Sequence, residues 1–579
     1  MKRCKNLNAE LPDSVLSLIF SKLTLKDLVK TSALSKHWSH ELGFMMKNIK
    51  DLNFDAYNMF DYNPLQKLPQ YLQLRDDQSR FATGLDQLML HYQGAMINSV
   101  RVKFPLGDQH RNVIDRLISQ GVTKGVKHIE LSFSHETNDI GFLVEAEPYR
   151  FSFTLLSNNT DSLMYLHLEN CFLVAPRGFS GLKNLRTLVL HFIVVEKKLL
   201  QGLLSNCVSL EDFTLDDCEF NFKLKIISPT LSHLKIVNCR GNFEGEIYIV
   251  ASNLSSLNYS CNGYRVHPIN FQTQMLSQFS YRCRQIIEFI SLDRLKNVTK
   301  IVLDGIDECL QSFVIPYLFK GSLQLEDITF KNCSIKKSME ITSIKLHHLK
   351  IIHCCFGDFN PYKISIDALN LSTFEFIGHT GSKFSVVAPK LSKVFWSAAI
   401  RYQNQFGPIP KLHQIENLAI LVNYSQIAKL TNVLGQLQNL RQLELCIIQP
   451  YDFNMEYFSI FEILMAAQHL QKFSLTVRRS QAVAGNLDQR TRRYANFCHN
   501  DLNFFELHGC VCTINAIEFV RHMLRNVNSV KKITFSSNDN YYLGAGRWTK
   551  GTNNDWFDRN FIHESLEDEV KGKCQLIVL

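Results

Sequence analysis

Apolar residues recur along this chain in triplets whose members are separated by three and then two positions. The first clear triplet is Leu163, Leu166 and Leu168, and the last is Val530, Ile533 and Phe535. Fifteen steps separate the final members of these two triplets, so the mean period is about 24 residues. The last two members of each triplet fall on one face of a short strand, because strand side chains alternate between faces. The pattern therefore predicts a stacked repeat array.

A period of this length is typical of leucine-rich repeats, in which every unit contributes one strand to a continuous parallel sheet. We therefore expect an α/β fold, a solenoid (horseshoe) with the parallel sheet on its concave side and return segments on its convex side. Three return segments have helical patterns, at residues 198–210, 460–470 and 516–527. Weaker triplets near Val100 and Ile129 extend the array toward the N-terminus.

Cysteines follow six of the triplets at a constant distance of three residues. This is the position where such repeats usually place Asn or Cys to complete the turn after the strand. They are Cys171, Cys218, Cys239, Cys333, Cys354 and Cys510. We therefore interpret these cysteines as structural.

Residues 11–38 read LPDSVLSLIFSKLTLKDLVKTSALSKHW and contain three short helical patterns. Pro12 suits the first turn of a helix, Thr24 with Asp27 matches a capping box, and Ser35 is a helix N-cap before Trp38. A bundle of about 40 residues buries too little surface to be stable alone, so we expect a partner protein. The apolar residues available to that partner are Leu11, Ile19, Leu23, Leu28, Leu34 and Trp38.

The Leu-Pro opening, the Leu25-Lys26-Asp27-Leu28 turn and the Leu34-Ser35-Lys36-His37-Trp38 ending resemble the F-box of plant proteins. The resemblance implies a three-helix F-box that docks on a Skp1-type adaptor, and through it on a cullin. Its adaptor-binding residues would be Leu11, Pro12, Ile19, Leu23, Leu28, Leu34 and Trp38. The C-terminal region resembles the FBD-like region of plant F-box proteins, at residues 502–509, 519–526 and 531–534.

These patterns divide the chain into four parts. We expect an F-box at 1–50, a connecting helical region at 51–95, a leucine-rich-repeat solenoid at 96–494, and terminal repeats with an FBD-like region at 495–579. The hydrophobic share of 45% and the charged share of 20% are those of a folded protein. No signal peptide and no membrane-spanning apolar stretch are evident, so we expect the protein to be located in the nucleus, the cytoplasm or both.

Charge gives no sign of a nucleic-acid partner. The net charge of +9 is spread over 579 residues, whereas phosphate binding needs a concentrated basic surface. Residues expected on the concave strands mix basic Lys235, Arg282, Lys331 and Lys350 with acidic Glu169, Asp216, Asp304, Glu375, Glu444 and Glu506. A basic run from Arg478 to Arg493 lies in a polar stretch between repeats, and we interpret it as a solvated loop.

No constellation for catalysis, cofactor or metal binding stands out. Gly544-Ala545-Gly546 is followed by Arg547 and Trp548, not by the Gly-Lys-Ser/Thr of a phosphate-binding loop. Two clusters contain zinc-ligand residue types, but successive strand residues point to opposite faces and do not converge on one ion. The clusters are His347, His348, His353, Cys354 and Cys355, and His508, Cys510 and Cys512.

The resemblance implies a non-catalytic receptor that holds an unknown protein substrate on its repeats for ubiquitin transfer by other subunits. Two alternatives remain open: a scaffold that binds the adaptor without substrate turnover, and a receptor that requires a small molecule. On the central concave strands we select Arg282, Lys331 and Lys350 as substrate-binding residues.

Overall fold

The computed structural model describes residues 15, 50–60, 71–92, 94–134, 147–156, 160–174, 181–241, 246–262, 268–284, 295–306, 314–335, 338–356, 363–378, 383–398, 406–448, 457–478, 494–495, 497–509, 513–549 and 558–579. The chain divides into two compact units, Met1–Leu276 and Ser277–Leu579. All predicted adaptor-binding residues lie outside the described residues. In the described part of the chain, no helix combines the length and apolarity needed to cross a membrane.

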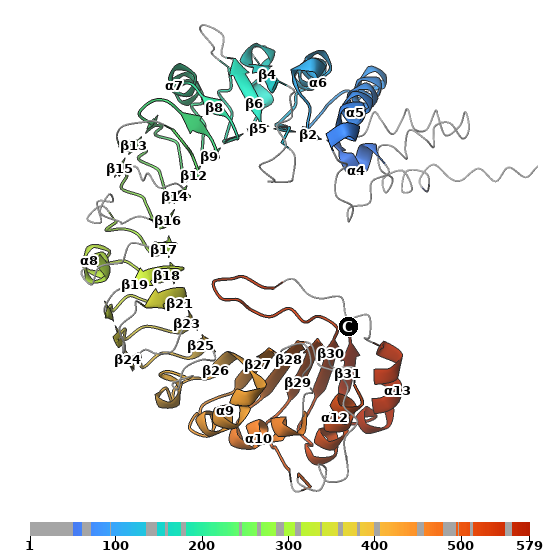
Figure 1. The fold of residues 1–579 in the computed structure, drawn as a ribbon, viewed down its shortest axis with the longest axis vertical. Helices are drawn as coiled ribbons and strands as arrows, with labels where there is room; N and C mark the ends of the chain where they lie inside the picture. Colours follow the sequence, from blue (N-terminus) through green and yellow to red (C-terminus); the bar gives the residue numbers. More distant parts are fainter. Residues whose placement is uncertain are drawn as a thin grey trace, which may run out of the picture. The chain divides into compact units, whose positions relative to one another are not determined.

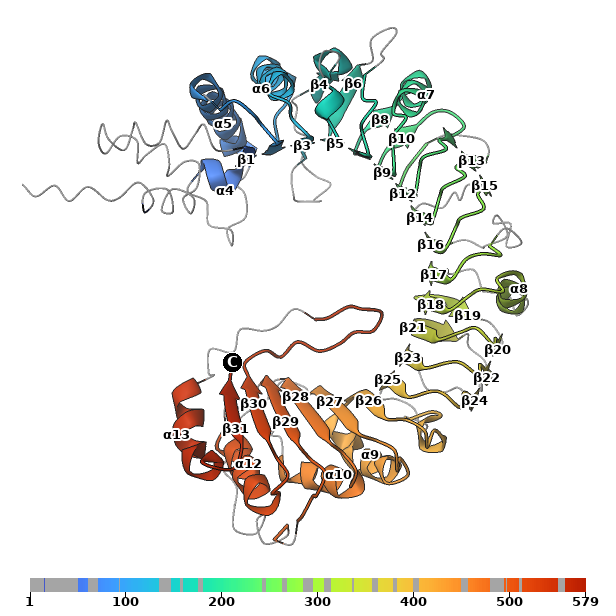
Figure 2. The same cartoon turned by 180° about the vertical axis from the view of Figure 1, so that it is seen from behind.

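Parallel strands, one from each repeat, form the main sheet of the first unit (Figures 1 and 2). In order across the sheet they are β1 (Asp51–Asp55), β2 (Ser99–Lys103), β3 (His128–Ser132), β5 (Tyr165–Glu169), β7 (Thr187–His191), β9 (Asp212–Asp216), β12 (His233–Val237) and β14 (Ser256–Cys261). Strand β1 lies in the region predicted as a helical connection, so the sheet begins earlier than the triplets indicate. Helices α4 (Ala56–Met59) and α5 (Tyr71–His91) follow it.

The second unit has the same organisation. Its main sheet runs through β16 (Gln278–Cys283), β17 (Lys300–Asp304), β18 (Asp327–Lys331), β21 (His348–Phe356), β23 (Thr373–Gly378), β25 (Lys393–Ala398), β26 (Asn417–Val422), β27 (Gln442–Ile448), β28 (Lys472–Arg478), β29 (Phe504–Gly509), β30 (Lys532–Ser536) and β31 (Gln575–Val578). Arg478, predicted in a solvated loop, is instead the last residue of β28. The leucine-rich-repeat sheet is confirmed.

Return segments cover one face of each main sheet, some as helices and some as short strands. The helices are α6 (Arg111–Thr123), α7 (Lys197–Asn206), α8 (Val314–Gly321), α9 (Ile427–Leu434), α10 (Ile460–Ala466), α12 (Ile514–Asn526) and α13 (Arg559–Val570). The strands are β4 (Tyr149–Ser152), β6 (Cys171–Val174), β8 (Val194–Val195), β10 (Glu219–Phe220), β11 (Lys225–Ile227), β13 (Ile247–Val250), β15 (Ile269–Gln272), β19 (Ser334–Ile335), β20 (Met339–Thr342), β22 (Lys363–Asp367) and β24 (Lys383–Val387). All three predicted helical segments are confirmed in α7, α10 and α12.

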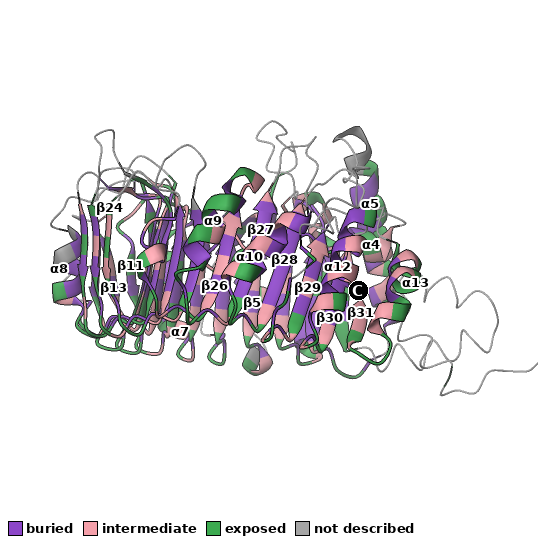
Figure 3. Ribbon diagram, turned by 90° about the horizontal axis from the view of Figure 1, so that it is seen from below, coloured by how far each residue is buried: buried purple, intermediate pink, exposed green. Residues whose placement is uncertain are grey.

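The register of the strands aligns the apolar triplets with one another. In the first unit Leu166 pairs with Leu188, and Leu188 pairs with Phe213. In the second unit Leu418 pairs with Leu443, and Leu443 pairs with Phe473. These residues are buried between the sheet and the return segments (Figure 3). Alternate side chains point to the opposite face, which we call the open face.

A left-handed residue ends several strands directly before a structural cysteine. Its backbone φ is 54° at Asn170, 47° at Asp217, 52° at Asn238 and 51° at Asn332. Asn and Asp tolerate this conformation better than most residues. The thiols that follow point inward: Cys218 donates to the Leu190 carbonyl (3.2 Å) and Cys333 to the Leu303 carbonyl (3.4 Å) of the neighbouring repeat. The structural role is confirmed for the five described cysteines, whereas Cys510 lies outside the described residues.

Trp396, the last member of its triplet, packs between the main sheet and the return strands. Its side chain is 1% exposed and stacks on Phe376 of β23, with ring centroids 4.5 Å apart. It also meets Phe384 of β24 edge-on, at 5.4 Å. We expect Trp396→Ala to destabilise the second unit by about 3–5 kcal/mol, because it removes a large buried side chain from a packed core.

The measurement is chemical unfolding followed by hydrogen exchange in the second unit. Leu369→Ala is the matched control because Leu369 is 49% exposed and should change stability by less than about 0.5 kcal/mol. Equal effects of the two substitutions would contradict the packing described here.

Candidate functional site

A segment after β30 folds back over the open face of the second unit (Figure 1). We call residues 537–549 the strap. Tyr542 and Trp548 form an antiparallel bridge, and the Leu543 N–H donates to the Arg547 carbonyl at 2.7 Å. The turn between them has left-handed backbone at Gly544, Ala545 and Gly546, with φ of 77°, 50° and 78°. The glycine-rich triplet that fails as a phosphate loop therefore forms the tip of a hairpin.

Glu375 of β23 anchors the tip of the strap. Its Oε2 accepts hydrogen bonds from the Tyr542 hydroxyl (3.0 Å) and the Ala545 N–H (2.8 Å), and Lys350 Nζ lies 3.6 Å from its Oε1. Burial, together with the nearby Glu375 charge, raises the pKa of Tyr542 to about 12, so its hydroxyl stays protonated and donates. The anchor joins residues 167 positions apart in the sequence.

Apolar contacts support this anchor. Ile352, Ile377 and Phe395 form a buried cluster on the open face, and Tyr542 and Ala545 of the strap pack against it. The Tyr542 ring meets Phe395 edge-on at 4.8 Å. At Gly544 a Cβ atom would lie 2.7 Å from Ile377 Cδ1, so only glycine lets the tip approach this closely. Open-face side chains that water would otherwise reach are thus covered by the chain's own C-terminal region.

Arg478 fixes the base of the strap. Its Nε lies 3.5 Å from Oδ2 of Asp539, whose side chain is fully buried, and its guanidinium lies over the Tyr541 ring at 5.4 Å. A buried carboxylate requires a cationic or hydrogen-bonding partner. The sequence suggested a solvated role for this arginine because Asp539 lies far away in the chain.

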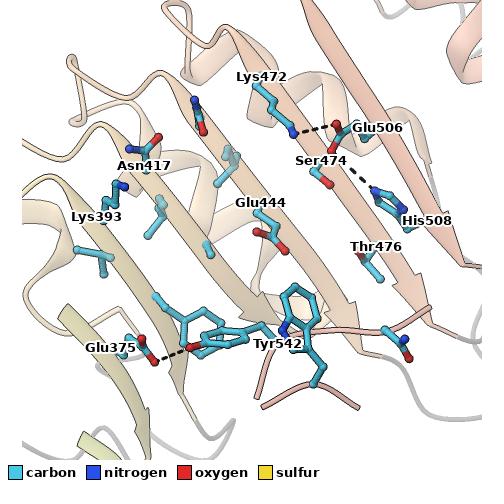
Figure 4. Close-up of a pocket in the computed structure, with 18 of the residues that line it drawn as sticks. Glu375, Lys393, Asn417, Glu444, Lys472, Ser474, Thr476, Glu506, His508 and Tyr542 are labelled. Carbon is cyan, nitrogen blue, oxygen red and sulfur yellow. Dashed lines mark hydrogen bonds and ion pairs between the residues drawn. The ribbon is translucent and has the colours of Figure 1, made fainter. Parts of the chain in front are cut away.

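A pocket of about 630 Å³ lies between the strap and strands β23 to β29 (Figure 4). Its lining combines charged, amide and aromatic side chains. The sheet contributes Thr373, Glu375, Lys393, Phe395, Asn417, Ala419, Gln442, Glu444, Lys472, Ser474, Thr476, Glu506 and His508, and the strap contributes Asn538, Asn540, Tyr542 and Trp548. Trp548 keeps 57% of its surface exposed.

Strand register explains the hollow. One row across the sheet reads Phe395, Ala419, Glu444, Ser474 and Glu506, each paired with the next. Small side chains at Ala419 and Ser474 flank Glu444 on both sides. The Ala419 and Ser474 side chains are too short to fill the space beside Glu444, and neither carries a charge that could pair with its carboxylate. The pocket floor therefore has one long acidic side chain between two short ones.

The two glutamates of this row have opposite electrostatic environments. Glu506 lies 2.8 Å from Lys472 Nζ and 3.9 Å from His508 Nε2. Contacts with His508 and then Lys472 lower its pKa to about 2, against the opposing effect of burial. Glu444 makes no hydrogen bond or ion pair with another described residue. Glu444 is exposed to the pocket. Partial burial of its carboxyl among the pocket walls nevertheless raises its pKa, and Glu506 adds to this rise, against the opposing charges of His508 and Lys472.

The predicted substrate-binding residues lie on the open face but outside this pocket. Lys331 Nζ lies 2.8 Å from Asp304 Oδ2, and Arg282 Nε lies 3.9 Å from the same oxygen. Lys350 faces Glu375, as described above. All three are paired with acids, so their charges are partly neutralised within the protein. Their role in substrate binding stays a prediction.

Several described members of the clusters considered for zinc make other contacts. His347 Nδ1 lies 3.1 Å from the Asn370 carbonyl, and His353 has left-handed backbone, with φ of 52°, at the register irregularity between Ile352 and Cys354 of β21. The Cys354 thiol donates to the Ile352 carbonyl. Cys510 and Cys512 lie outside the described residues.

Removing the Tyr542 side chain should release the strap, because it eliminates both a hydrogen bond to Glu375 and the contact with Phe395. We expect Tyr542→Ala to accelerate hydrogen exchange across residues 541–549 by at least about tenfold, the effect of losing one charge-assisted hydrogen bond. Phe504→Ala is the control, since Phe504 is an exposed aromatic on β29. Unchanged exchange in Tyr542→Ala would show that the Tyr542 side chain does not hold the tip of the strap.

Glu444 should cost the protein stability when it is charged. Its pKa is higher in the folded protein than in the unfolded chain. The folded state therefore loses stability relative to the unfolded state as the pH rises from the unfolded-chain pKa through the folded-state pKa. We expect Glu444→Gln to raise the melting temperature at pH 7, with the gain disappearing below about pH 4, where the carboxyl is protonated in both states. The control is Glu340→Gln at an exposed position on β20. Destabilisation at pH 7 by Glu444→Gln would contradict this description.

Comparison with known proteins gives the family. The model of the At1g61320/AtMIF1 leucine-rich-repeat domain matches residues 89–312 and 286–554, and the F-box domain model matches residues 9–40. The second match covers the motif on which the F-box resemblance was based. The first extends over both structural units and covers well over half of the chain.

Relatives from Arabidopsis thaliana agree with these matches. The F-box protein At1g80960 is 29% identical over 242 residues, which are 40% of this chain and 46% of that protein. The F-box/FBD/LRR-repeat protein At3g26920 is 26% identical over 41% of this chain and 50% of its own length. The FBD-associated F-box protein At5g56370 is 26% identical over 58% of this chain and 74% of its own length.

The matched part of this chain spans about half the length of the first two relatives. A solved leucine-rich-repeat protein of Leptospira interrogans, LIC12759, covers 69% of this chain at 13% identity, with a TM-score of 0.25. The family assignment depends on the domain models and on the register of the triplets. The chain belongs to the At1g61320/AtMIF1 leucine-rich-repeat family and carries an F-box domain at residues 9–40.

Proposed function

We propose that this chain is the substrate-recognition subunit of a Skp1-cullin-F-box ubiquitin ligase. The F-box binds a Skp1-type adaptor, the adaptor links the chain to a cullin, and the strap-covered pocket holds a segment of a protein substrate. The observation that carries the proposal is the presence, in one chain, of an F-box and a repeat domain with an open polar pocket. F-box proteins with leucine-rich repeats are generally receptors of this kind.

The lining of the pocket suits a polypeptide. Backbone groups of the parallel strands already bond to one another, so a bound chain has to be recognised by side chains. Asn417, Gln442, Asn538 and Asn540 supply amides, each of which both donates and accepts, as a peptide group does. Asn540 Oδ1 is buried without a hydrogen-bond partner among the described residues. An incoming N–H would satisfy it.

Glu444 supplies a second argument. A charged group that lowers stability and lacks an internal partner is typical of binding sites, where the partner comes from the ligand. Trp548 and Tyr542 stand on the facing wall with ring centroids 5.3 Å apart. Partly exposed aromatic side chains of this kind are common anchors in protein interfaces. Substrate binding and adaptor binding thus use different parts of the chain.

The pocket volume also favours a second candidate, a receptor whose substrate binding requires a small molecule. About 630 Å³ lies within the range of about 300–1,000 Å³ common for small-molecule sites. The two candidates can be distinguished by measuring the affinity of the purified chain, in complex with the adaptor, for a purified substrate. Full affinity without any added compound supports direct recognition, whereas affinity that appears only with a cell extract of low molecular mass supports the second candidate.

The two binding surfaces should be separable. Removal of residues 1–50, or Trp38→Ala in the F-box, should abolish or weaken adaptor binding, since truncating a buried interface anchor costs about 2 kcal/mol or more. Leu11→Ala with Pro12→Ala should act likewise. Each variant should still capture substrate, because every repeat contacts only its neighbours. Glu444→Gln, at a position lining the pocket, should do the opposite, retaining the adaptor while substrate capture falls.

The measurement compares adaptor capture, substrate capture and substrate half-life in one cell type. A longer substrate half-life is expected for both kinds of variant. If the F-box variants lose the adaptor but leave the half-life unchanged, the chain is a scaffold rather than a ligase subunit.

A further inference from the structure

Histidines and carboxylates gather on the open face of the first unit. Strands β3, β5, β7 and β9 bring them into neighbouring rows. Glu130 pairs with His167, Glu169 with His191, and His191 with Asp216. His167 and Glu169 are two residues apart on one strand and therefore share a face. The parallel register places His191 directly beside Glu169.

Three of these side chains converge. His167 Nε2 lies 3.9 Å from Glu169 Oε2, and His191 Nδ1 lies 3.6 Å from Glu169 Oε1. Potential ligand atoms of all three lie within 4.8 Å of one another. Ligands of a four-coordinate zinc ion are each about 2 Å from the metal and hence about 3.3 Å apart. Small side-chain rotations close the difference.

The two ring nitrogens of His167 have different surroundings. Nδ1 lies 3.8 Å from Glu130 Oε1, and Nε2 lies 3.9 Å from Glu169 Oε2. Both distances are too long for a hydrogen bond. Nε2 is also buried and has no hydrogen-bond partner among the described residues. A buried polar atom without a partner needs an explanation, and a bound ion is one of the usual ones. Nε2 faces the same carboxylate that His191 contacts.

Glu130 is held in place behind His167. Lys103 Nζ lies 3.0 Å from its Oε1, and Arg101 Nε lies 3.4 Å from its Oε2. Two cationic side chains thus flank the Glu130 carboxylate. Metal-binding histidines commonly present their second nitrogen to a fixed carboxylate, which sets the tautomer and orients the ring. Ligand atoms of Asp216 and Asp217 also lie within 4.8 Å of a ring nitrogen of His191.

We propose that His167, Glu169 and His191 bind a divalent transition-metal ion of the zinc class on the open face of the first unit. Two imidazole nitrogens with one carboxylate favour zinc and its neighbours over Mg²⁺ and Ca²⁺, which prefer oxygen ligands throughout. Three protein ligands leave a fourth position for water or for a side chain of a bound protein.

The same residues also form an ion-paired network without metal. In that case contact with Glu169 raises the pKa of His191, and a protonated imidazole pairs with the carboxylate. The sequence-based expectation of no zinc site concerned clusters of neighbouring residues on single strands, and the side chains of successive strand residues point to opposite faces. Here the ligands come from alternate positions on one strand and from the strand beside it. Zinc binding distinguishes the ion-paired network from a metal site.

The experiment uses the full chain co-expressed with a Skp1-type adaptor, stripped with a chelator and titrated with Zn²⁺ alone. We expect one zinc per chain by equilibrium dialysis with elemental analysis. His167→Gln and Glu169→Gln should each weaken binding by at least about a hundredfold, and Glu130→Gln, which removes only the supporting carboxylate, by about tenfold. Zinc should raise the melting temperature of the wild type and leave that of His167→Gln unchanged.

The matched control is the double variant His347→Gln and His348→Gln in the second unit, which removes two histidines elsewhere and should retain full affinity. Mg²⁺ at the same concentration should not compete. No bound zinc, or zinc bound equally by wild type and His167→Gln, would overturn the proposal. Because no substrate or ubiquitination step enters the assay, its outcome is independent of the proposed ligase function.

Discussion

The alignment of apolar triplets in parallel register is the constraint on which the rest of this structure depends. Each repeat cannot bury its apolar residues alone, so it stacks on its neighbours with Leu beside Leu or Phe across successive strands. Burial fixes the register, because a slip of one residue would turn the apolar set toward water. Once one face is fixed in this way, the residues of the opposite face also fall into rows.

Those rows determine the chemistry of the open face. In the second unit the row through Glu444 places short side chains on both sides of it, and the strap adds a wall from a distant part of the sequence. In the first unit the rows place His191 beside Glu169 and Glu130 beside His167. Neither group contributes to the core. Both are polar arrangements that the apolar register holds in place.

Sequence patterns were sufficient for the repeat, the main sheet, the structural cysteines and the F-box motif, because each depends on local spacing. They were insufficient for the sites, because row neighbours become known only when the register is known. Glu375 and Tyr542 are 167 positions apart, and no spacing relates them. Arg478 was misinterpreted for the same reason, since its partner Asp539 comes from the strap. The Gly544-Ala545-Gly546 triplet was the available signal for a hairpin.

The central claim is that one chain connects an adaptor to a substrate through two separate regions. It is tested most directly by quantitative mass spectrometry of proteins that co-purify with wild type and with Glu444→Gln from cells with blocked proteasomes. The account predicts equal recovery of the adaptor and the cullin, together with selective loss of a small set of proteins from Glu444→Gln. If neither wild type nor Glu444→Gln recovers the adaptor, or if the two recover the same set of proteins, the central claim is contradicted.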